Sequence, residues 1–358
     1  MRILFIIHSL GIGGMEHVMV TLLRYYALNK TGELHLLIIG RNREILHDVP
    51  EQVDIHKPTW EFNNNVRFWH TLKTISFVRK KTKDINPDTI LSFGEMWNNL
   101  VLLALLGLPY PIFISDRSQP GKDLGWLQNC LREQLYPMAR GYIAQTEEAK
   151  KVALKKKWNY NIEVIGNPIL QISCTNASRE KNVISVGRLI PTKQFDKLIS
   201  VFHQCKPKDW RLIIVGGDAK KMQLSKKLNE IVHHLRIEEQ VILTGAQRDV
   251  VPYYCDNSVF AFMSISEGFP NALAEAMAAG CACIAYDCIA GPSDIIDDGI
   301  NGFLIPLGDH EMYKKKLSQL MSDEGLRFSF GRAAKEKMKQ FEIGKIAERF
   351  HSFITESF

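Results

Sequence analysis

The 358-residue chain lacks the features that mark fibrous, disordered and membrane-spanning proteins. Its longest apolar stretch, residues 101–114, is too short to cross a bilayer and is broken by Pro109 and Pro111. The apolar N-terminus has no small-residue cleavage site, so it fits a first buried strand better than a signal peptide. The hydrophobic content of 46% and the charged content of 23% are those of an ordinary globular protein.

Cysteine is scarce and is not arranged as a disulfide framework. The seven cysteines are an odd number without framework spacing, which is typical of a reducing compartment and predicts a cytoplasmic protein. Cys281 and Cys283 alternate within an apolar run, so we expect buried strand residues rather than metal ligands. The net charge of +6 fits phosphate-bearing partners or an anionic membrane, and equally an ordinary soluble protein. Aromatic and basic residues are not interleaved, so no nucleic-acid partner is predicted.

Short apolar runs alternate with helix-length segments, which predicts an α/β protein with parallel sheets covered on both faces. The first set of runs comprises residues 3–7, 36–39, 89–92, 112–115 and 142–144. Turn-forming residues from Gly166 to Pro168 interrupt the pattern, which restarts at 183–186, 212–215, 241–243, 259–263, 283–286 and 303–305. We therefore expect two doubly wound, Rossmann-like domains facing across a cleft. Their predicted ranges are 1–166 and 167–342, and the amphipathic segment 343–358 could pack on either domain.

Glycines directly follow the first predicted strand. Gly13 and Gly14 would let the backbone approach a ligand, and a helix beginning there would direct N–H groups at an anion. A strand-to-helix turn can also need glycine for geometry alone. The dinucleotide fingerprint is broken, because Glu16 occupies its third glycine position and Gly40-Arg41 brings no ribose-binding acid. A nicotinamide-dependent oxidoreductase is therefore disfavoured.

Two cations lie five residues apart after the first strand of the second domain. Arg188 and Lys193 could converge on one diphosphate and neutralise the charge of a departing nucleotide. Ordinary solvated surface charges would give the same spacing.

A short helix with two acids follows residues 264–270. Pro270 suits its first turn and Gly280 its C-terminal cap, so Glu267 lies in the preceding loop and Glu275 in the second turn. Either Glu275 faces solvent, or both carboxylates accept hydrogen bonds from sugar and ribose hydroxyls. No opposed acid pair of the glycosidase kind is identifiable.

A further helix start is predicted at residues 291–296. Gly291-Pro292 forms a sharp turn and Ser293 is a suitable N-cap, so helix N–H groups could face a ligand. A structural cap and a phosphate site have the same sequence pattern.

Together these segments resemble glycosyltransferase family 4, retaining enzymes of the GT-B fold. The resemblance covers the whole chain and is most specific in residues 266–271 followed by 275–280, the paired-glutamate motif. Residues 186–189 with Lys193, 13–16 and 291–296 match in the same order. The resemblance implies polysaccharide biosynthesis with galactosyl-, glucosyl- or N-acetylhexosaminyl-transfer, and a last helix that returns to the first domain.

The resemblance also implies roles for individual residues. Arg188 and Lys193 would grip the donor diphosphate, Glu267 the transferred sugar and Glu275 the ribose hydroxyls. Glu16 would serve the acceptor side. Further donor contacts are implied for Gly13, Gly14, Gly268, Phe269, Pro270, Asn271 and Ser293.

The chain departs from the family at the end of the strand 112–115. Many members carry a histidine there, whereas this chain has Asp116-Arg117 followed by Pro120. Such an acid–arginine pair resembles a subset that uses galactose-, glucose- or hexosamine-type donors. Arg117 and Asp116 are therefore candidates for binding the donor sugar or an acceptor phosphate.

No Asp-x-Asp motif follows an apolar strand, so we expect a metal-independent, retaining transfer without a cofactor. The donor would be a nucleotide diphosphate sugar, with uridine suggested by the subset. The acceptor would be a glycan, including one linked to polyprenyl diphosphate. Lys150, Lys151 and residues 155–157 form a basic segment that is either a solvated face or a peripheral contact with an anionic membrane, on the inner face of the plasma membrane. The alternatives are a GT-B sugar-nucleotide epimerase and a non-catalytic subunit that binds a nucleotide sugar.

Overall fold

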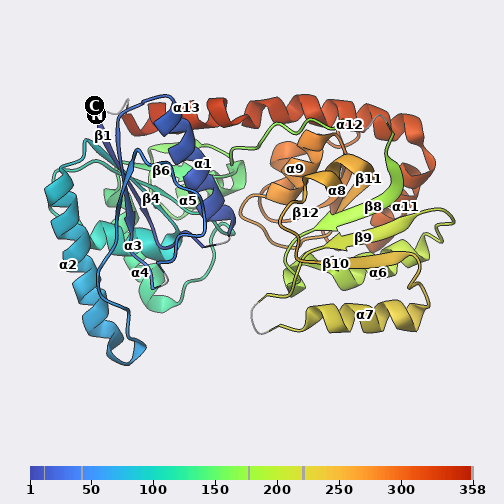
Figure 1. The fold of residues 1–358 in the computed structure, drawn as a ribbon, viewed down its shortest axis with the longest axis horizontal. Coiled ribbons are helices and arrows are strands. Elements are labelled where there is room, and N and C mark those ends of the chain that lie inside the picture. The colour runs from blue at the N-terminus through green and yellow to red at the C-terminus, as the bar shows by residue number, and fades with distance from the viewer. Residues whose placement is uncertain (12, 42, 176–177, 220–221, 356–358) are drawn as a thin grey trace. The chain divides into compact units, whose positions relative to one another are not determined.

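The computed structural model describes the chain except for residues 12, 42, 176–177, 220–221 and 356–358. It consists of two compact units (Figure 1). Unit 1 comprises Met1–Pro168 and Ile343–Phe358, and unit 2 comprises Ile169–Glu342. The boundary therefore follows Pro168 rather than Gly166.

Unit 1 is built on a seven-stranded parallel sheet with the strand order β3-β2-β1-β4-β5-β6-β7. The strands are β1 (Arg2–Ile7), β2 (Glu33–Ile38), β3 (Val53–His56), β4 (Thr89–Phe93), β5 (Ile112–Ser115), β6 (Gly141–Ala144) and β7 (Ile162–Val164). The helices are α1 (Gly14–Leu28), α2 (Arg67–Ile85), α3 (Glu95–Ala104), α4 (Trp126–Leu135), α5 (Glu147–Lys155) and α13 (Ile343–Thr355), with short 3-10 turns at Asn64–Val66 and Tyr136–Met138. The central strands are continuous apolar runs because both faces of the sheet are covered.

The last helix completes unit 1. In Figure 1, red α13 lies beside blue α1, although more than 300 residues separate them in the chain. The Tyr26 hydroxyl donates to the Ala347 carbonyl at 2.7 Å, and the Thr89 hydroxyl donates to the Ile354 carbonyl at 2.8 Å. The return of the chain after unit 2 therefore covers β4 and supplies part of the unit 1 core.

Unit 2 is built on a six-stranded parallel sheet with the order β10-β9-β8-β11-β12-β13. The strands are β8 (Glu180–Val186), β9 (Arg211–Val215), β10 (Val241–Gly245), β11 (Asn257–Phe262), β12 (Ala282–Asp287) and β13 (Phe303–Pro306). The helices are α6 (Phe195–Gln204), α7 (Leu224–Leu235), α8 (Val251–Asp256), α9 (Asn271–Ala279), α10 (Pro292–Ile295), α11 (His310–Ser322) and α12 (Glu324–Met338), with 3-10 turns at Pro191–Lys193 and Lys339–Phe341. The expected α/β architecture with two doubly wound sheets is confirmed.

The cysteines differ in part from expectation. Cys174 and Cys255 form a disulfide with their Cα atoms 5.2 Å apart, so the expectation of unpaired cysteines is wrong for these two. Their 81-residue separation hides the contact, because only the fold brings the segment after the unit boundary against α8. Cys281 and Cys283 are buried as expected, and burial raises the pKa of both thiols.

Candidate active site

The strand order fixes where each unit can bind a ligand. Ligands of open parallel sheets bind at the carboxyl ends of the strands, at the point where the strand order reverses. This point lies between β8 and β11 in unit 2, and between β1 and β4 in unit 1. The loops after these four strands carry most of the residues singled out from the sequence.

An ion pair joins the two central loops of unit 2. Lys193 Nζ lies 2.7 Å from Glu267 Oε1, and the two side chains are 17% and 14% exposed. The ammonium also lies 5.0 Å from the centre of the Phe262 ring. The Ile265 amide donates to the Thr192 carbonyl at 2.9 Å, so backbone contact holds the two loops together. A cation and a carboxylate are thereby fixed side by side at the switch point.

Arg188 precedes Lys193 on the loop after β8 and is exposed. The Leu189 amide donates to the Gly217 carbonyl at 2.9 Å, which ties this loop to the segment after β9. The structure therefore places both predicted cations on one loop. Lys193 is held by Glu267, whereas Arg188 projects from the surface of unit 2.

Glu275 lies on α9 and is partly buried. The Tyr254 hydroxyl, from α8, donates to Glu275 Oε2 at 3.0 Å. Burial raises the pKa of Glu275, and the hydrogen bond from Tyr254 opposes that shift. The alternative in which Glu275 simply faces solvent is therefore wrong.

The residues at the start of α9 differ in their exposure. Phe269 belongs to the unit 2 core, with its ring centre 5.6 Å from that of Phe341, so only its backbone is available to a donor. Gly268 and Asn271 remain partly exposed. Pro270 caps α9 instead of lying in its first turn, and it is buried like Phe269.

The expected N-cap role of Ser293 is wrong. Gly291 caps α10, and Ser293 is an exposed residue within this four-residue helix. Gly291 has a φ of 110°, and a Cβ at this position would collide with the Pro270 ring. The close approach of two loops, rather than side-chain capping, therefore decides the helix start.

In unit 1 the loop after β1 encloses a buried acid. Gly13 is the N-cap of α1, and a Cβ there would run into the carboxylate of Glu16. Ser9 Oγ donates to Glu16 Oε1 at 3.1 Å, and His8 Nε2 lies 3.6 Å from the same oxygen. A larger residue at position 13 would therefore displace the Glu16 carboxylate, and Gly14 is the first helical residue.

His8 is a candidate that the sequence patterns did not reveal. It directly follows β1 at the switch point of unit 1, and its ring stacks on Trp97 at a centroid distance of 5.5 Å. Burial lowers the pKa of His8, while Glu16 and Glu95 act in the opposite direction. Its position directly after the first predicted strand is the one sequence feature that could have identified it.

Asp116 and Arg117 have different surroundings after β5. Asp116 Oδ1 accepts hydrogen bonds from the Tyr136 hydroxyl at 2.6 Å and from Asn98 Nδ2 at 3.1 Å. Burial raises the pKa of Asp116 to about 7, and the nearby Glu95 carboxylate adds to this shift. Asp116 is therefore an internal acid of unit 1.

The Arg117 guanidinium lies 4.4 Å from the centre of the Phe93 ring and donates to Asn167 Oδ1 at 2.9 Å. Burial lowers the pKa of Arg117 to about 9, which Glu95 opposes. These contacts connect the end of β5 to the last residues before the unit boundary, so Arg117 has a packing role in addition to any ligand.

A cavity of about 500 Å³ opens beside the switch point of unit 1. His8 and Ser9 from the β1 loop, and Arg41 after β2, contribute its polar side. Its wall is mainly apolar and aromatic: Ile39, Phe62, Ile75, Met96, Trp97, Leu100, Leu103 and Leu131. The cavity can therefore hold a ligand with a substantial apolar portion.

Proteins of similar sequence are glycosyltransferases. Residues 173–337, nearly all of unit 2, match the family model described as "Glycosyl transferases group 1". The chain is 28% identical over 361 residues to N-acetylgalactosamine-N,N'-diacetylbacillosaminyl-diphospho-undecaprenol 4-alpha-N-acetylgalactosaminyltransferase of Campylobacter jejuni, covering 95% of this chain and 96% of the relative.

Solved structures share the fold across the full length. The lipopolysaccharide outer core galactosyltransferase WaaB superposes with a TM-score of 0.79 at 22% identity, covering 100% of both chains. Anabaena HepE in complex with UDP and glucose superposes with a TM-score of 0.80 at 17% identity, covering 99% of this chain and 100% of HepE.

The chain is a GT-B glycosyltransferase.

Within the described part of this glycosyltransferase, no helix combines the length and apolarity that a membrane crossing requires. The predicted basic segment forms the end of α5 and the turn after it, and Lys151, Lys155, Lys156 and Lys157 are exposed. Lys151 lies 3.5 Å from Glu148, so part of its charge is compensated locally.

The transferase exposes large apolar side chains elsewhere on unit 1. Phe68, Trp69 and Leu72 at the start of α2 are 68%, 64% and 41% exposed, and Trp126 at the start of α4 is 79% exposed. Other residues of α2 and α4, among them Arg67 and Leu131, line the cavity.

Proposed function

We propose that this glycosyltransferase moves a hexose or N-acetylhexosamine from a UDP-linked donor to a polyprenyl-diphosphate-linked glycan, with retention of configuration and without a metal ion. The Lys193–Glu267 pair at the switch point of unit 2 is the observation that carries the donor half. The apolar cavity at the switch point of unit 1 supports the acceptor half. Both halves accord with the names of the relatives.

The donor half follows from charge. A nucleotide diphosphate leaves with developing negative charge, which Lys193 and Arg188 can neutralise from a single loop. Glu267 holds the Lys193 ammonium in place and offers carboxylate oxygens to sugar hydroxyls. Glu275, fixed by Tyr254, is proposed to accept hydrogen bonds from the ribose. Two cations and helix N–H groups then supply the charge stabilisation that a divalent metal provides elsewhere.

The acceptor half follows from the mixed lining of the unit 1 cavity. His8 and Ser9 at its polar side are candidates for contact with the acceptor sugar, and the buried Glu16 carboxylate, which accepts a hydrogen bond from Ser9, lies next to both. Arg41 and Arg67 at the cavity can pair with phosphates. The apolar wall suits isoprenoid carbons, as expected for a lipid-linked acceptor.

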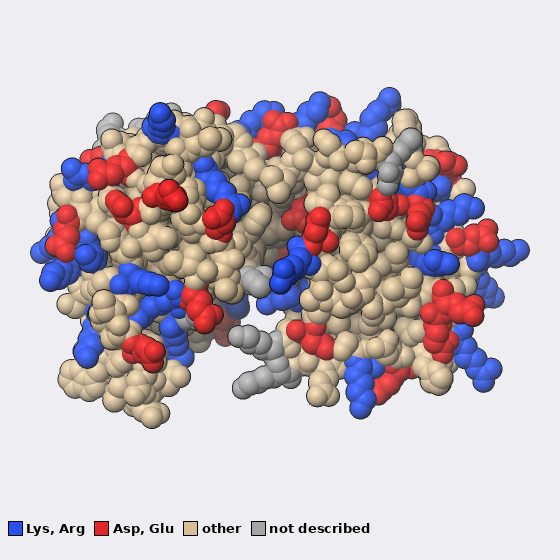
Figure 2. Space-filling view, viewed as in Figure 1, with Lys and Arg blue, Asp and Glu red and all other residues tan. Residues whose placement is uncertain are grey.

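A lipid-linked acceptor requires access to a membrane surface. Helix α2 carries six Lys or Arg residues and a single acid, Asp84, behind its exposed Phe68 and Trp69. Figure 2 shows an uncharged tip where Figure 1 draws the start of α2, with Lys or Arg side chains on either side and an acidic side chain between them. Aromatic side chains flanked by cations favour an anionic membrane interface. We propose that this tip, rather than α5, makes the peripheral contact.

The proposal is tested by ligand binding and by product analysis. In EDTA, thermal shift against sugar nucleotides should select a UDP-sugar, because a ligand at a hundredfold over its Kd adds ~2.7 kcal/mol of apparent stability. NMR of the product should then show a new glycosidic bond on a polyprenyl-diphosphate glycan, with the anomeric configuration of the donor. Conversion of the sugar nucleotide without an acceptor would identify an epimerase instead. Binding without turnover on any lipid-linked glycan would indicate a non-catalytic subunit.

A further inference from the structure

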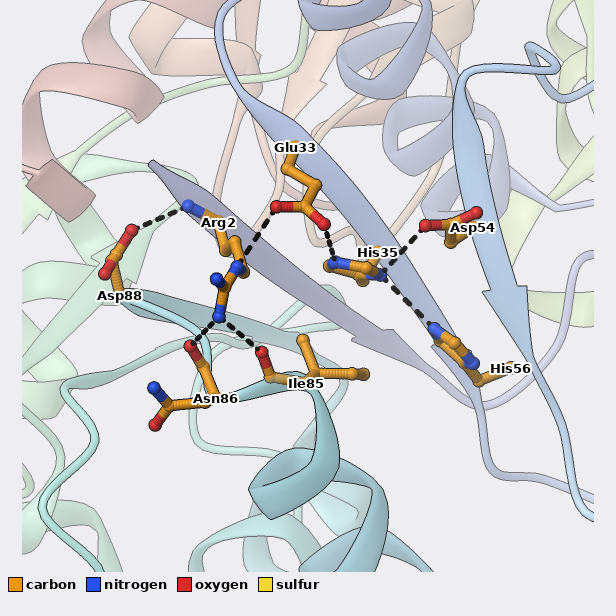
Figure 3. Close-up of polar contacts among 8 residues, drawn as sticks. All are labelled: Arg2, Glu33, His35, Asp54, His56, Ile85, Asn86 and Asp88. Carbon is orange, nitrogen blue, oxygen red and sulfur yellow. Dashed lines mark hydrogen bonds and ion pairs between the residues drawn. The ribbon is translucent and has the colours of Figure 1, made fainter.

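A cluster of charged side chains at the β2–β3 edge of unit 1 is paired internally (Figure 3). Glu33 and Asp54 approach opposite nitrogens of His35, each at 3.5 Å. Arg2 Nε donates to Glu33 Oε2 at 3.0 Å. These contacts connect β2 to its neighbouring strands, so the cluster has a structural explanation.

A different cluster, in unit 2, gathers sulfur atoms around one guanidinium. The disulfide joins Cys174, shortly before β8, to Cys255 of α8. Arg179 Nη2 lies 3.9 Å from Cys174 Sγ, and Arg179 Nη1 lies 3.3 Å from the Sγ of the free cysteine Cys281. A cation close to a cysteine sulfur stabilises its thiolate and is typical of reactive rather than inert cysteines.

Tyr254 connects this sulfur cluster to the candidate donor site. It directly precedes Cys255 in α8, and its carbonyl accepts hydrogen bonds from Arg179 Nη1 at 2.6 Å and from Cys281 Sγ at 3.1 Å. Its hydroxyl donates to Glu275 Oε2 at 3.0 Å. One residue therefore contacts the sulfur cluster through its backbone and the acid of α9 through its side chain. A change in the position of α8 is transmitted directly to Glu275.

Helix α8 depends on tertiary contacts for its position. It has six residues, fewer than a helix needs to be stable by itself. Besides the disulfide, Arg179 holds its end by donating to the carbonyls of Tyr254 and Asn257, each at 2.6 Å. These hydrogen bonds do not require the S–S bond, so reduction should loosen α8 without releasing it. The expected consequence is a weaker Tyr254–Glu275 hydrogen bond in an otherwise folded unit 2.

We infer that the Cys174–Cys255 disulfide is a reversible redox link that fixes the position of Tyr254, and that its reduction weakens binding of the nucleotide donor at Glu275. The inference rests on the proposed function, because Glu275 is a donor residue only there. All residues of the link belong to unit 2. The oxidation state of one cystine thus regulates the affinity of this unit for the donor.

Reduction proceeds by thiol–disulfide exchange with a dithiol. Cys174 is partly exposed and Cys255 is buried, so one thiolate of the reductant attacks Cys174 Sγ. The S–S bond breaks, and Cys255 leaves as a thiolate that takes up a proton. The second thiolate of the reductant attacks the reductant's own sulfur in the mixed disulfide and releases Cys174 beside Arg179. Two electrons and two protons pass from the dithiol to the cystine, and the nearby cation favours this direction because it stabilises the released thiolate.

The loss of donor affinity should depend on pH. Burial raises the pKa of Glu275 and the Tyr254 hydroxyl opposes this shift, so a looser contact lets the carboxylate take up a proton earlier as the pH falls. The protonated acid is the poorer acceptor for ribose hydroxyls. Arg179 is the charged group at the Tyr254 backbone, and the Cys281 and Cys283 thiols stay neutral because burial raises their pKa. Reduction should therefore weaken donor binding at pH 5.5 and have little effect at pH 8.

The test begins with a thiol count on the unfolded full-length protein. The chain has seven cysteines, of which five should react with a chromogenic thiol reagent after dialysis in air, and all seven after treatment with dithiothreitol. Peptide mass spectrometry should show the Cys174–Cys255 link in the oxidised form. Calorimetry at pH 5.5 then compares UDP binding by the two forms. We expect the reduced form to bind about three- to tenfold more weakly, the effect of weakening one hydrogen bond.

Three variant proteins locate the effect. Cys174→Ser combined with Cys255→Ser should bind UDP like the reduced native protein and should not respond to dithiothreitol. Tyr254→Phe should bind UDP equally in its oxidised and reduced forms, because it lacks the hydroxyl that carries the link. Cys205→Ser, which alters a free cysteine at the end of α6, is the matched control and should keep the full response.

Seven reactive thiols after dialysis in air would overturn the inference, because the disulfide would then not form. Equal UDP affinities of the oxidised and reduced native protein at pH 5.5 would overturn it as well, and so would a full response in Tyr254→Phe. The native protein alone decides the first two points, so poor folding of a variant does not mask a negative result. If neither form binds UDP, the donor assignment fails together with the link, whereas equal binding by both forms is a failure of the link alone.

Discussion

The Tyr254 hydroxyl donates a 3.0 Å hydrogen bond to Glu275, so an internal residue of α8 positions the acid proposed to hold the donor ribose. The contact stabilises the charged carboxylate against the cost of burial, since it lowers a pKa that burial raises. The two residues can therefore be separated experimentally. Glu275 is expected to contact the donor, and Tyr254 is expected to act only through the pKa of Glu275.

Glu275→Gln should weaken UDP binding by at least tenfold at neutral pH, because the amide is a poorer acceptor for ribose hydroxyls. Tyr254→Phe should leave binding nearly intact at high pH and reduce it at low pH. Its Glu275 pKa should be higher than in the native protein, so the carboxylate is protonated earlier as the pH falls. Calorimetry with UDP between pH 5 and 8 measures both effects. Equal pH profiles for Tyr254→Phe and the native protein would contradict the assigned coupling.

Lys193→Met should lower kcat by about a hundredfold, since loss of one stabilising charge costs ~3 kcal/mol in the transition state. The matched control is Lys197→Met on α6, an exposed lysine four residues further along. Initial rates with saturating donor and acceptor make the comparison. Full turnover by Lys193→Met would show that the diphosphate lies elsewhere.

Phe68→Ser with Trp69→Ser should reduce co-sedimentation with anionic vesicles by at least tenfold, because each buried aromatic side chain contributes roughly 1.5–3 kcal/mol. Lys155→Gln with Lys156→Gln at the end of α5 and the turn after it is the comparison pair and should have a small effect. The reverse ranking would return the membrane contact to the basic segment. If the native protein does not co-sediment with neutral vesicles, binding also requires the negative charge of the membrane surface.

Asp116→Asn should remove a pH dependence of stability. In the folded protein the pKa of Asp116 is about 7, above its usual value near 4, so the folded state holds the proton more tightly. Native stability should therefore fall as the pH rises from about 4 to 7, by on the order of 4 kcal/mol from this group. The asparagine variant should lack that slope. Urea unfolding at several pH values gives the difference, and parallel curves for the two proteins would contradict the assignment.

The sequence predicted the architecture well because buried parallel strands leave a strong local signal. Runs such as 3–7 and 259–263 are apolar on both faces and contain no competing helical period. The edge strand β3 was not predicted. Its sequence, Val53-Asp54-Ile55-His56, is half polar, so pattern alone does not separate it from a loop.

The candidate site was predictable where local motifs carry it. The loop acid Glu267 and the loop cation Lys193 follow their strands as expected, but their mutual contact depends on the strand order, which sequence patterns do not reveal. The prediction of Ser293 as an N-cap was wrong because serine is common at positions that are not caps. Close packing of two loops at Gly291 determines where α10 begins. His8 was missed since a lone histidine has no spacing to read.

The contact of α13 with α1 and β4 also has a consequence for biosynthesis. Residues 343–355 are translated only after the whole of unit 2, yet Phe350 and Ile354 are fully buried in the unit 1 core. Unit 1 therefore cannot complete its core when its own first 168 residues have left the ribosome. Unit 2, although second in the chain, has all of its residues first, so we expect it to reach its native state earlier, with unit 1 waiting in a partly formed state that chaperones can recognise.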